Sequence, residues 1–272
     1  MKHNFKHAIK TYLAIITVSL IIMCQNANAQ PGYRILVPMP RYQPGYGPYP
    51  PPHIASQVYN PMVNSPLPFM SIGIHFDPLI SWFSTDSYNL HNDGAVPGFN
   101  FGFSYNRYFS PNYSFSSGIN IINAGGRLIS SEITQLELKN YNYDLIVVQP
   151  GEAITYRITY LSIPLGFKLQ SNQIGYGIFF TDLGFDPKFV IGGRADIPSL
   201  SINGGNAISE FRTFNLSFHV MAGMEYPLGG YSRVVFGIGF ENNFFDVTRD
   251  NGYEPYDVVT HKLLSFRIGF TF

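Results

Sequence analysis

The chain has 272 residues, with 17 basic and 17 acidic side chains and a formal net charge of zero. Only 12% of the residues are charged, against roughly 25% in an ordinary soluble domain, whereas 16% are aromatic and 26 are glycine. Without a basic excess, nucleic acid is not an expected partner. The single cysteine, Cys24, excludes a disulfide framework.

Residues 1–29 have the layout of a secretory signal peptide. Three lysines precede a mostly apolar run over Tyr12–Met23, and Ala27 and Ala29 form a small-x-small cleavage site. A membrane anchor is the alternative, but the run is shorter than the ~20 residues that a membrane helix needs. We expect a mature chain that begins at Gln30, with 14 basic and 17 acidic residues and a net charge of −3.

Residues 30–68 form a proline-rich segment with 11 of the 20 prolines. Such a composition cannot bury a core and favours extended polyproline II structure. The segment is predicted to be a disordered periplasmic spacer. The alternative is that residues 31–66 bind a periplasmic or secretion partner.

From Phe69 onward the sequence alternates with a period of two, which is typical of β-strands. Short connections alternate with long ones, as in outer-membrane barrels, where short turns face the periplasm. Residues 69–272 are therefore predicted to form an all-β, eight-stranded antiparallel transmembrane β-barrel. The eight predicted strands cover 69–83, 97–109, 112–129, 152–170, 174–194, 209–226, 231–246 and 259–272.

The composition of the two strand faces distinguishes a membrane barrel from a soluble one. In the last strand, Leu264, Phe266 and Ile268 alternate with Ser265 and Arg267. Across the strands the polar face consists mostly of Gly, Ser and Asn, whereas a barrel exterior in water is normally rich in charged residues. We therefore expect the apolar face to contact lipid and the small polar residues to fill a narrow lumen.

The last strand also resembles the signal that the barrel-assembly machinery of the outer membrane recognises. Phe270 and Phe272 match its aromatic positions and Ser265 its polar position, although Arg267 stands where a glycine is usual. The expected partners are therefore outer-membrane lipid and this assembly machinery.

Residues 160–168, with the sequence Tyr-Leu-Ser-Ile-Pro-Leu-Gly-Phe-Lys, resemble a strand of the PorT-like outer-membrane barrel family. The Gly-aromatic segment 175–178 and the Phe-terminated last strand are similar too. The resemblance covers about 69–272 and implies a monomeric eight-stranded barrel in the outer membrane. Some PorT-like proteins serve secretion or gliding machinery, and the family has no catalytic residues to transfer.

Five polar side chains on the inner face are candidates for a buried lumen network. An eight-stranded barrel is just wide enough for its own side chains to fill it, and charges buried there need partners. Glu225 is expected to pair with Arg267 or Lys168. The network is either a salt-bridge plug or an ion path. The candidates are His75, Lys168, Glu225, Glu241 and Arg267.

The fourth strand contains an irregularity. Apolar residues fall on even positions up to Tyr160 and on odd positions from Leu161, and Pro164 lacks a backbone donor. A bulge or a change of face is therefore predicted near 160–164.

Three functions remain open at this level. The preferred one is a non-enzymatic outer-membrane barrel with a structural or accessory role in secretion or surface machinery. The second is a narrow channel or small-solute transporter. The third is a lipid- or peptide-modifying enzyme with a His–Asp–Ser or Asp–His site. Its candidate residues are His91, Asp86, Ser87 and Asp93 in the first loop, His261 at the top of the last strand, and Asp246, Asp250 and Asp257 in the last loop. No cofactor or metal motif is present in the sequence.

Overall fold

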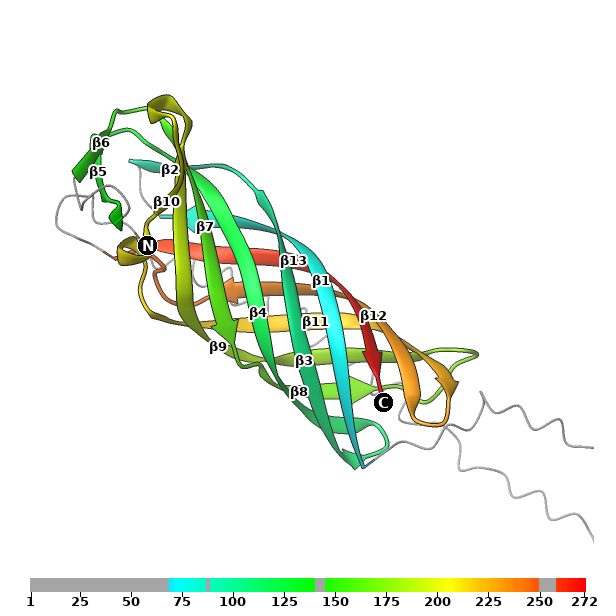
Figure 1. The fold of residues 1–272 in the computed structure, drawn as a ribbon. Coiled ribbons are helices and arrows are strands. Elements are labelled where there is room, and N and C mark those ends of the chain that lie inside the picture. Colours follow the sequence, from blue (N-terminus) through cyan, green and yellow to red (C-terminus); the bar gives the residue numbers. More distant parts are fainter. Residues whose placement is uncertain (1–68, 87–88, 140–144, 250–257) are drawn as a thin grey trace, which may run out of the picture. The chain divides into compact units, whose positions relative to one another are not determined.

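Eight antiparallel segments close into a ring in the computed structural model, which describes residues 69–86, 89–139, 145–249 and 258–272. Every neighbouring pair is antiparallel, and β13 pairs with β1 to close the ring (Figure 1). The predicted fold class is confirmed. In order, the ring contains β1 (Met70–Thr85), β3 (Val96–Ser110), β4 (Tyr113–Ser130), β7 (Ala153–Ser162) with β8 (Leu165–Gln170), β9 (Ile178–Ile197), β11 (Phe214–Gly229), β12 (Ser232–Asn243) and β13 (Val259–Thr271).

The two ends of the ring differ. At one end, called here the turn end, short connections join β3 to β4, β8 to β9 and β11 to β12. At the opposite end, the loop end, the long connections contain further short elements. These are β2 (Leu90–Gly94), β5 (Thr134–Glu137), β6 (Leu145–Val148), η2 (Pro198–Leu200), β10 (Ile202–Asn206) and η3 (Ile208–Glu210). None of the helices in the described ranges is long and apolar enough to cross a membrane.

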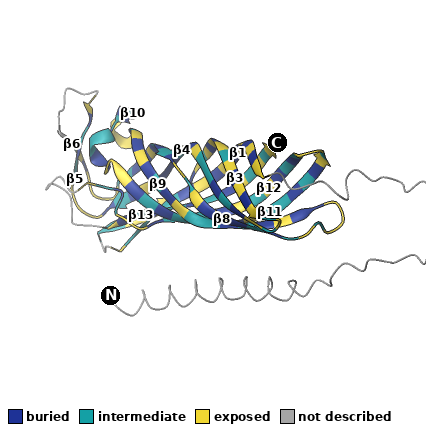
Figure 2. Cartoon of the chain, turned by 90° about the horizontal axis from the view of Figure 1, so that it is seen from below, coloured by how far each residue is buried: buried dark blue, intermediate teal, exposed yellow. Residues whose placement is uncertain are grey.

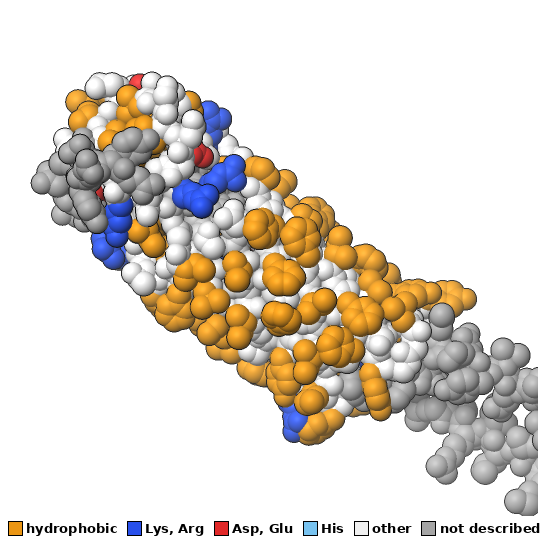
Figure 3. Space-filling model, viewed as in Figure 1, with side chains coloured by type: hydrophobic (Ala, Val, Ile, Leu, Met, Phe, Trp, Pro, Cys, Tyr) orange, Lys and Arg blue, Asp and Glu red, His pale blue; other side chains and the backbone are white. Residues whose placement is uncertain are grey.

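Burial alternates along the strands because successive side chains point to opposite faces of a sheet. Figure 2 shows this alternation, and β1 follows it over most of its length. The outer wall carries large exposed hydrophobic side chains such as Phe103, Phe185 and Ile268. On the face drawn in Figure 3, hydrophobic side chains form a broad band over the barrel wall, and Lys and Arg side chains lie between this band and the loop end.

The predicted irregularity in the fourth strand is present without a change of face. Inward side chains keep even numbers from Ile154 through Tyr160 to Lys168. The strand is interrupted at Ile163 and Pro164, and the facing strand β9 contains a bulge opposite Thr159 and Tyr160. What changes along this strand is the chemistry of the inward side chains, from apolar to polar.

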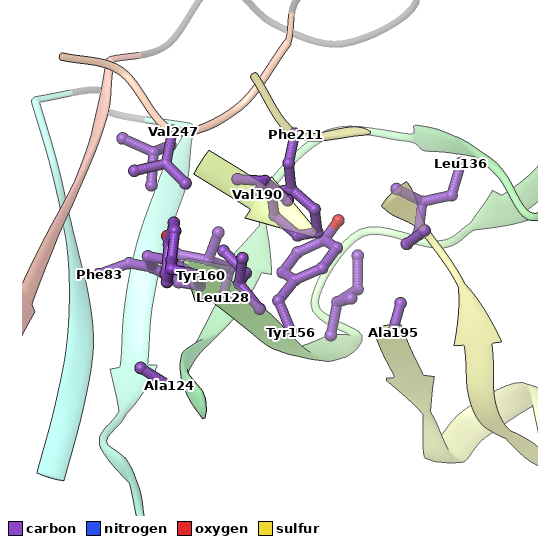
Figure 4. Packing of buried hydrophobic residues seen from close by; sticks show 14 of the residues in the cluster. Phe83, Ala124, Leu128, Leu136, Tyr156, Tyr160, Val190, Ala195, Phe211 and Val247 are labelled. Atoms are coloured by element: carbon purple, nitrogen blue, oxygen red, sulfur yellow. The ribbon is translucent and has the colours of Figure 1, made fainter. Parts of the chain in front are cut away.

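The apolar inward side chains form a core inside the loop half of the barrel. Phe83, Tyr156 and Tyr160 come from the barrel wall, while Leu136 and Phe211 come from the long connections, and all five are buried. Figure 4 shows these side chains converging. The long connections are therefore held to the barrel by burial of apolar surface, and the polar part of the lumen lies between this core and the turn end.

Candidate functional site: the polar lumen

A buried three-residue ion cluster lies near the turn end. The carboxylate of Glu225 contacts Nζ of Lys168 with one oxygen and lies 2.7 Å from Nη1 of Arg233 with the other. Nζ of Lys168 also lies 4.4 Å from the centre of the Phe180 ring. All three charged side chains are buried. A single buried carboxylate therefore forms ion pairs with two cations that are shielded from water.

A second cluster lies at mid-height around Asp77, which is fully buried. Nη2 of Arg267 donates to Asp77 at 2.9 Å, and Nδ2 of Asn100 donates to the same oxygen at 2.9 Å. Nδ1 of His75 lies 3.1 Å from the carboxylate. The four side chains come from three adjacent strands, so this cluster joins β13, β1 and β3 inside the barrel.

A third cluster places His219 between two carboxylates. Its Nδ1 lies 3.0 Å from Asp186, and its Nε2 lies 3.7 Å from Asp182. The hydroxyl of Ser116 donates to Asp182 at 2.7 Å. Because Asp182 is also opposite Lys168 in the pairing of β8 and β9, this cluster borders the cluster at the turn end.

The polar lumen ends at the apolar core. Lys188 forms an ion pair with Glu241, and its Nζ lies 5.7 Å from the centre of the Tyr160 ring. The Tyr160 hydroxyl lies 3.1 Å from Nδ1 of His261, and Nε2 of His261 lies 3.1 Å from the carbonyl oxygen of Gly125. At this level the Tyr160 hydroxyl and both ring nitrogens of His261 have specific partners, as buried polar groups usually do.

Little free space remains between the clusters. The cavity lined by side chains that include His75, Asp182 and Arg267 leaves about 60 Å³ for the centres of water molecules. Roughly 10–15 Å³ is needed for one water. The lumen therefore has room for a few waters, and a solute the size of a sugar would have to displace side chains.

The five side chains expected to form the lumen network all face inward. Lys168 and Glu225 contact each other, while His75 and Arg267 meet at Asp77 instead of at Glu225. The considered pairing of Glu225 with Arg267 is therefore not made. Glu241 contacts Lys188.

Six further charged or titratable members of the network are not among the five candidates named from the sequence. Strand periodicity could have found them, since each stands an even number of residues from another inward residue of its strand. The inward face of their strands was harder to identify from the sequence, because apolar residues occupy some neighbouring inward positions. These members are Asp77, Asp182, Asp186, Lys188, His219 and Arg233.

The loop residues considered for an enzyme do not come together in the described part of the chain. His261 is fully buried beside Phe83 and Tyr160, whereas His91 is exposed in β2. Asp246 accepts hydrogen bonds from Thr248 and from the backbone of Val259 and forms an ion pair with Arg212. Ser87, Asp250 and Asp257, which were also considered, lie outside the described residues.

The residues of the expected assembly signal occupy both faces of β13. Ser265 is buried, and its hydroxyl lies 3.4 Å from the carbonyl oxygen of Gly239. Phe270 and Phe272 are exposed on the outer wall. Their recognition by the assembly machinery stays a prediction.

Residues 70–249 match the family model of the outer membrane protein beta-barrel domain. Among solved structures, Ail of Yersinia pestis is 14% identical, with a TM-score of 0.37 over 75% of this chain and 99% of Ail. Neisserial surface protein A is 10% identical (TM-score 0.40; 74% and 96% covered), and OprG of Pseudomonas aeruginosa is 9% identical (TM-score 0.40; 74% and 94% covered). No curated protein matches the chain significantly.

The family assignment rests on the family model, which spans more than half of the chain. It agrees with the closed antiparallel ring and with the apolar outer wall, as expected of strands that cross a lipid bilayer. It does not test the narrower resemblance to PorT-like barrels. The chain belongs to the outer membrane protein beta-barrel domain family and is located in the outer membrane.

Proposed function

We propose that this protein is a non-enzymatic, monomeric outer-membrane barrel of the PorT-like type, with a structural or accessory role in secretion or surface machinery. The observation that carries the proposal is the filled lumen. Buried ion pairs occupy it toward the turn end, and an apolar core occupies it toward the loop end. A barrel of this kind acts through the surfaces that it presents at its two ends.

The loop end supports a binding role because its connections are built as a packed layer. Leu136, Leu138 and Val148 are almost completely buried, although they come from connections between barrel strands. A carboxylate oxygen of Glu210 accepts a hydrogen bond from the backbone of Glu137 at 3.0 Å. In outer-membrane barrels the longer connections face the outside, so this layer would be displayed on the cell surface.

The other proposed binding element is the proline-rich segment. In this proposal residues 1–29 are removed as a signal peptide, residues 30–68 extend into the periplasm and residues 69–272 form the barrel. A segment rich in proline retains little conformational freedom to lose on binding, which favours recognition of an extended motif. Residues 31–66 would then contact a periplasmic or secretion partner.

Cross-linking in intact cells tests this role, with the full chain compared with two variants. Deletion of 31–66 should abolish a specific cross-linked product while the barrel still inserts and migrates faster on a gel before boiling. A variant with the same residues 31–66 in scrambled order keeps length and composition but should also lose the product. If the scrambled variant keeps it, the segment is a spacer and the proposed contact is wrong.

A narrow channel is the second candidate, favoured by the polar side chains that line the remaining cavity. Planar-bilayer conductance separates the two candidates. The accessory role predicts a barrel that conducts no ions, because a conducting path would have to cross both the ion clusters and the apolar core. Reproducible single-channel steps from the heat-modifiable protein would favour the channel.

A further inference from the structure

Three arginines lie together on the outer wall, on three adjacent strands. Arg157 of β7 and Arg194 of β9 are directly opposite each other in the strand pairing. Arg127 of β4 is opposite Thr155, two residues along β7 from Arg157. All three are exposed. Side chains directly opposite each other on one face have Cβ atoms only about 5 Å apart, and like charges there are destabilising.

Neighbouring carboxylates neutralise this arginine cluster only in part. Nε of Arg127 lies 3.2 Å from Asp93, and Nε of Arg157 lies 3.9 Å from Asp196. Within the described part of the chain, Arg194 makes no ion pair or side-chain hydrogen bond. Three cations therefore share two carboxylates, and the guanidinium groups retain donors that point outward.

The position of the arginine cluster along the barrel axis indicates which part of the membrane surrounds it. Along β9, the outward side chains from Phe179 to Ile191 are largely apolar and exposed. Twelve residues cover about 40 Å of strand, or about 30 Å along the barrel axis at a tilt of ~40°, which is close to the apolar thickness of an outer-membrane barrel. Arg194 stands three residues beyond Ile191, at the level where polar headgroups begin.

The neighbouring strands show the same change in polarity at the same level. Leu161 is opposite the exposed Phe189, and the next outward residue of β7, Thr159, accepts a hydrogen bond from Asn123 at 3.1 Å. Arg157 follows one step farther toward the loop end. Figure 3 shows Lys and Arg side chains where the apolar band ends on this side of the barrel.

We propose that Arg127, Arg157 and Arg194 bind the phosphate groups of a phosphorylated glycolipid in the outer leaflet. A guanidinium group forms paired hydrogen bonds with phosphate oxygens, and a phosphate bound among several guanidinium groups offsets the repulsion between these cations. The lipid chains of the same molecule lie against the apolar wall below the arginines, so headgroup and acyl chains are recognised together. This inference does not depend on the accessory role proposed above.

Native mass spectrometry of the folded barrel in neutral detergent tests the site, with bis-phosphorylated lipid A as the probe. The wild type should retain the lipid, and Arg157→Gln/Arg194→Gln should reduce its affinity at least fivefold. Arg194→Gln alone should reduce affinity measurably, and it keeps both ion pairs of the cluster. Arg249→Gln is the matched control, because Arg249 is exposed at the loop end away from the wall and should bind lipid like the wild type.

Two comparisons define the ligand. Lipid A without its phosphates should bind the wild type as weakly as the intact lipid binds the double variant. Millimolar inorganic phosphate should displace the intact lipid poorly, because it lacks the acyl chains. The proposal is overturned if the phosphate-free lipid binds equally well, if Arg249→Gln weakens binding as much as the cluster variants, or if free phosphate competes as well as the lipid does.

Discussion

The hydroxyl of Tyr160 and Nδ1 of His261 lie 3.1 Å apart at the level where the interior changes from polar to apolar. Both side chains are fully buried, and they come from strands on different sides of the ring. This hydrogen bond links β7 to β13 across the interior. The interior contacts therefore hold the barrel together independently of the backbone ladder.

Tyr160→Phe should destabilise the barrel by about 1–3 kcal/mol, because the buried ring nitrogen of His261 loses its partner while the ring volume is kept. Urea unfolding of the lipid-inserted protein, followed by tryptophan fluorescence, measures the change. Tyr105→Phe is the control, since Tyr105 is exposed on the outer wall and should change stability little. Equal effects of the two substitutions would show that the buried hydrogen bond contributes nothing.

Glu225→Gln should destabilise the barrel more than Lys168→Met. The first change removes the carboxylate that pairs with both Lys168 and Arg233, and removal of one partner of a buried pair costs about 3–5 kcal/mol. The second leaves Glu225 paired with Arg233 at 2.7 Å. The same unfolding measurement checks the order, and a larger loss for Lys168→Met would contradict it.

Gly184→Ala should destabilise the barrel by about 1–3 kcal/mol, as overpacking does in a filled interior. A Cβ at Gly184 would lie 2.6 Å from Cα of Gly166 and 2.7 Å from Cε1 of His219. The control is Gly192→Ala in the same strand, whose Cβ would lie 3.5 Å from Thr159, an ordinary contact. Comparison of the two unfolding midpoints is the measurement, and similar midpoints would rule out close approach at Gly184.

Phe272→Ala should reduce assembly into the outer membrane, because it removes an aromatic side chain of the expected signal but keeps the backbone. The backbone of Phe272 bonds to Ile72 in both directions, at 2.9 and 3.0 Å. Deletion of Phe272 removes these bonds as well and should be more severe. Fractionation and gel mobility before and after boiling measure both variants, with Phe244→Ala as the exposed loop-end control. Normal assembly of Phe272→Ala would show that the assembly machinery does not recognise this aromatic side chain.

The eight strands and the apolar wall could be predicted from the sequence because alternation is a local property. In β13 each residue faces opposite its neighbour, so Phe266 and Phe270 share one face of the strand and Ser265 lies on the other. The inward position of Lys168 or Glu225 follows by the same reasoning. The long connections were predicted as loops, and their short strands and apolar packing depend on the barrel beneath them.

The partners inside the lumen were decided only by the tertiary structure. Asp77 and Arg267 are 190 residues apart, and they meet because the register of β1 and β13 brings them to one height. The apolar core also depends on the tertiary structure: Tyr156 occupies an ordinary inward position, yet its ring packs edge-on against Phe211 from a loop connection. Sequence alternation determines which face a side chain is on, whereas ring closure and register determine what it meets there.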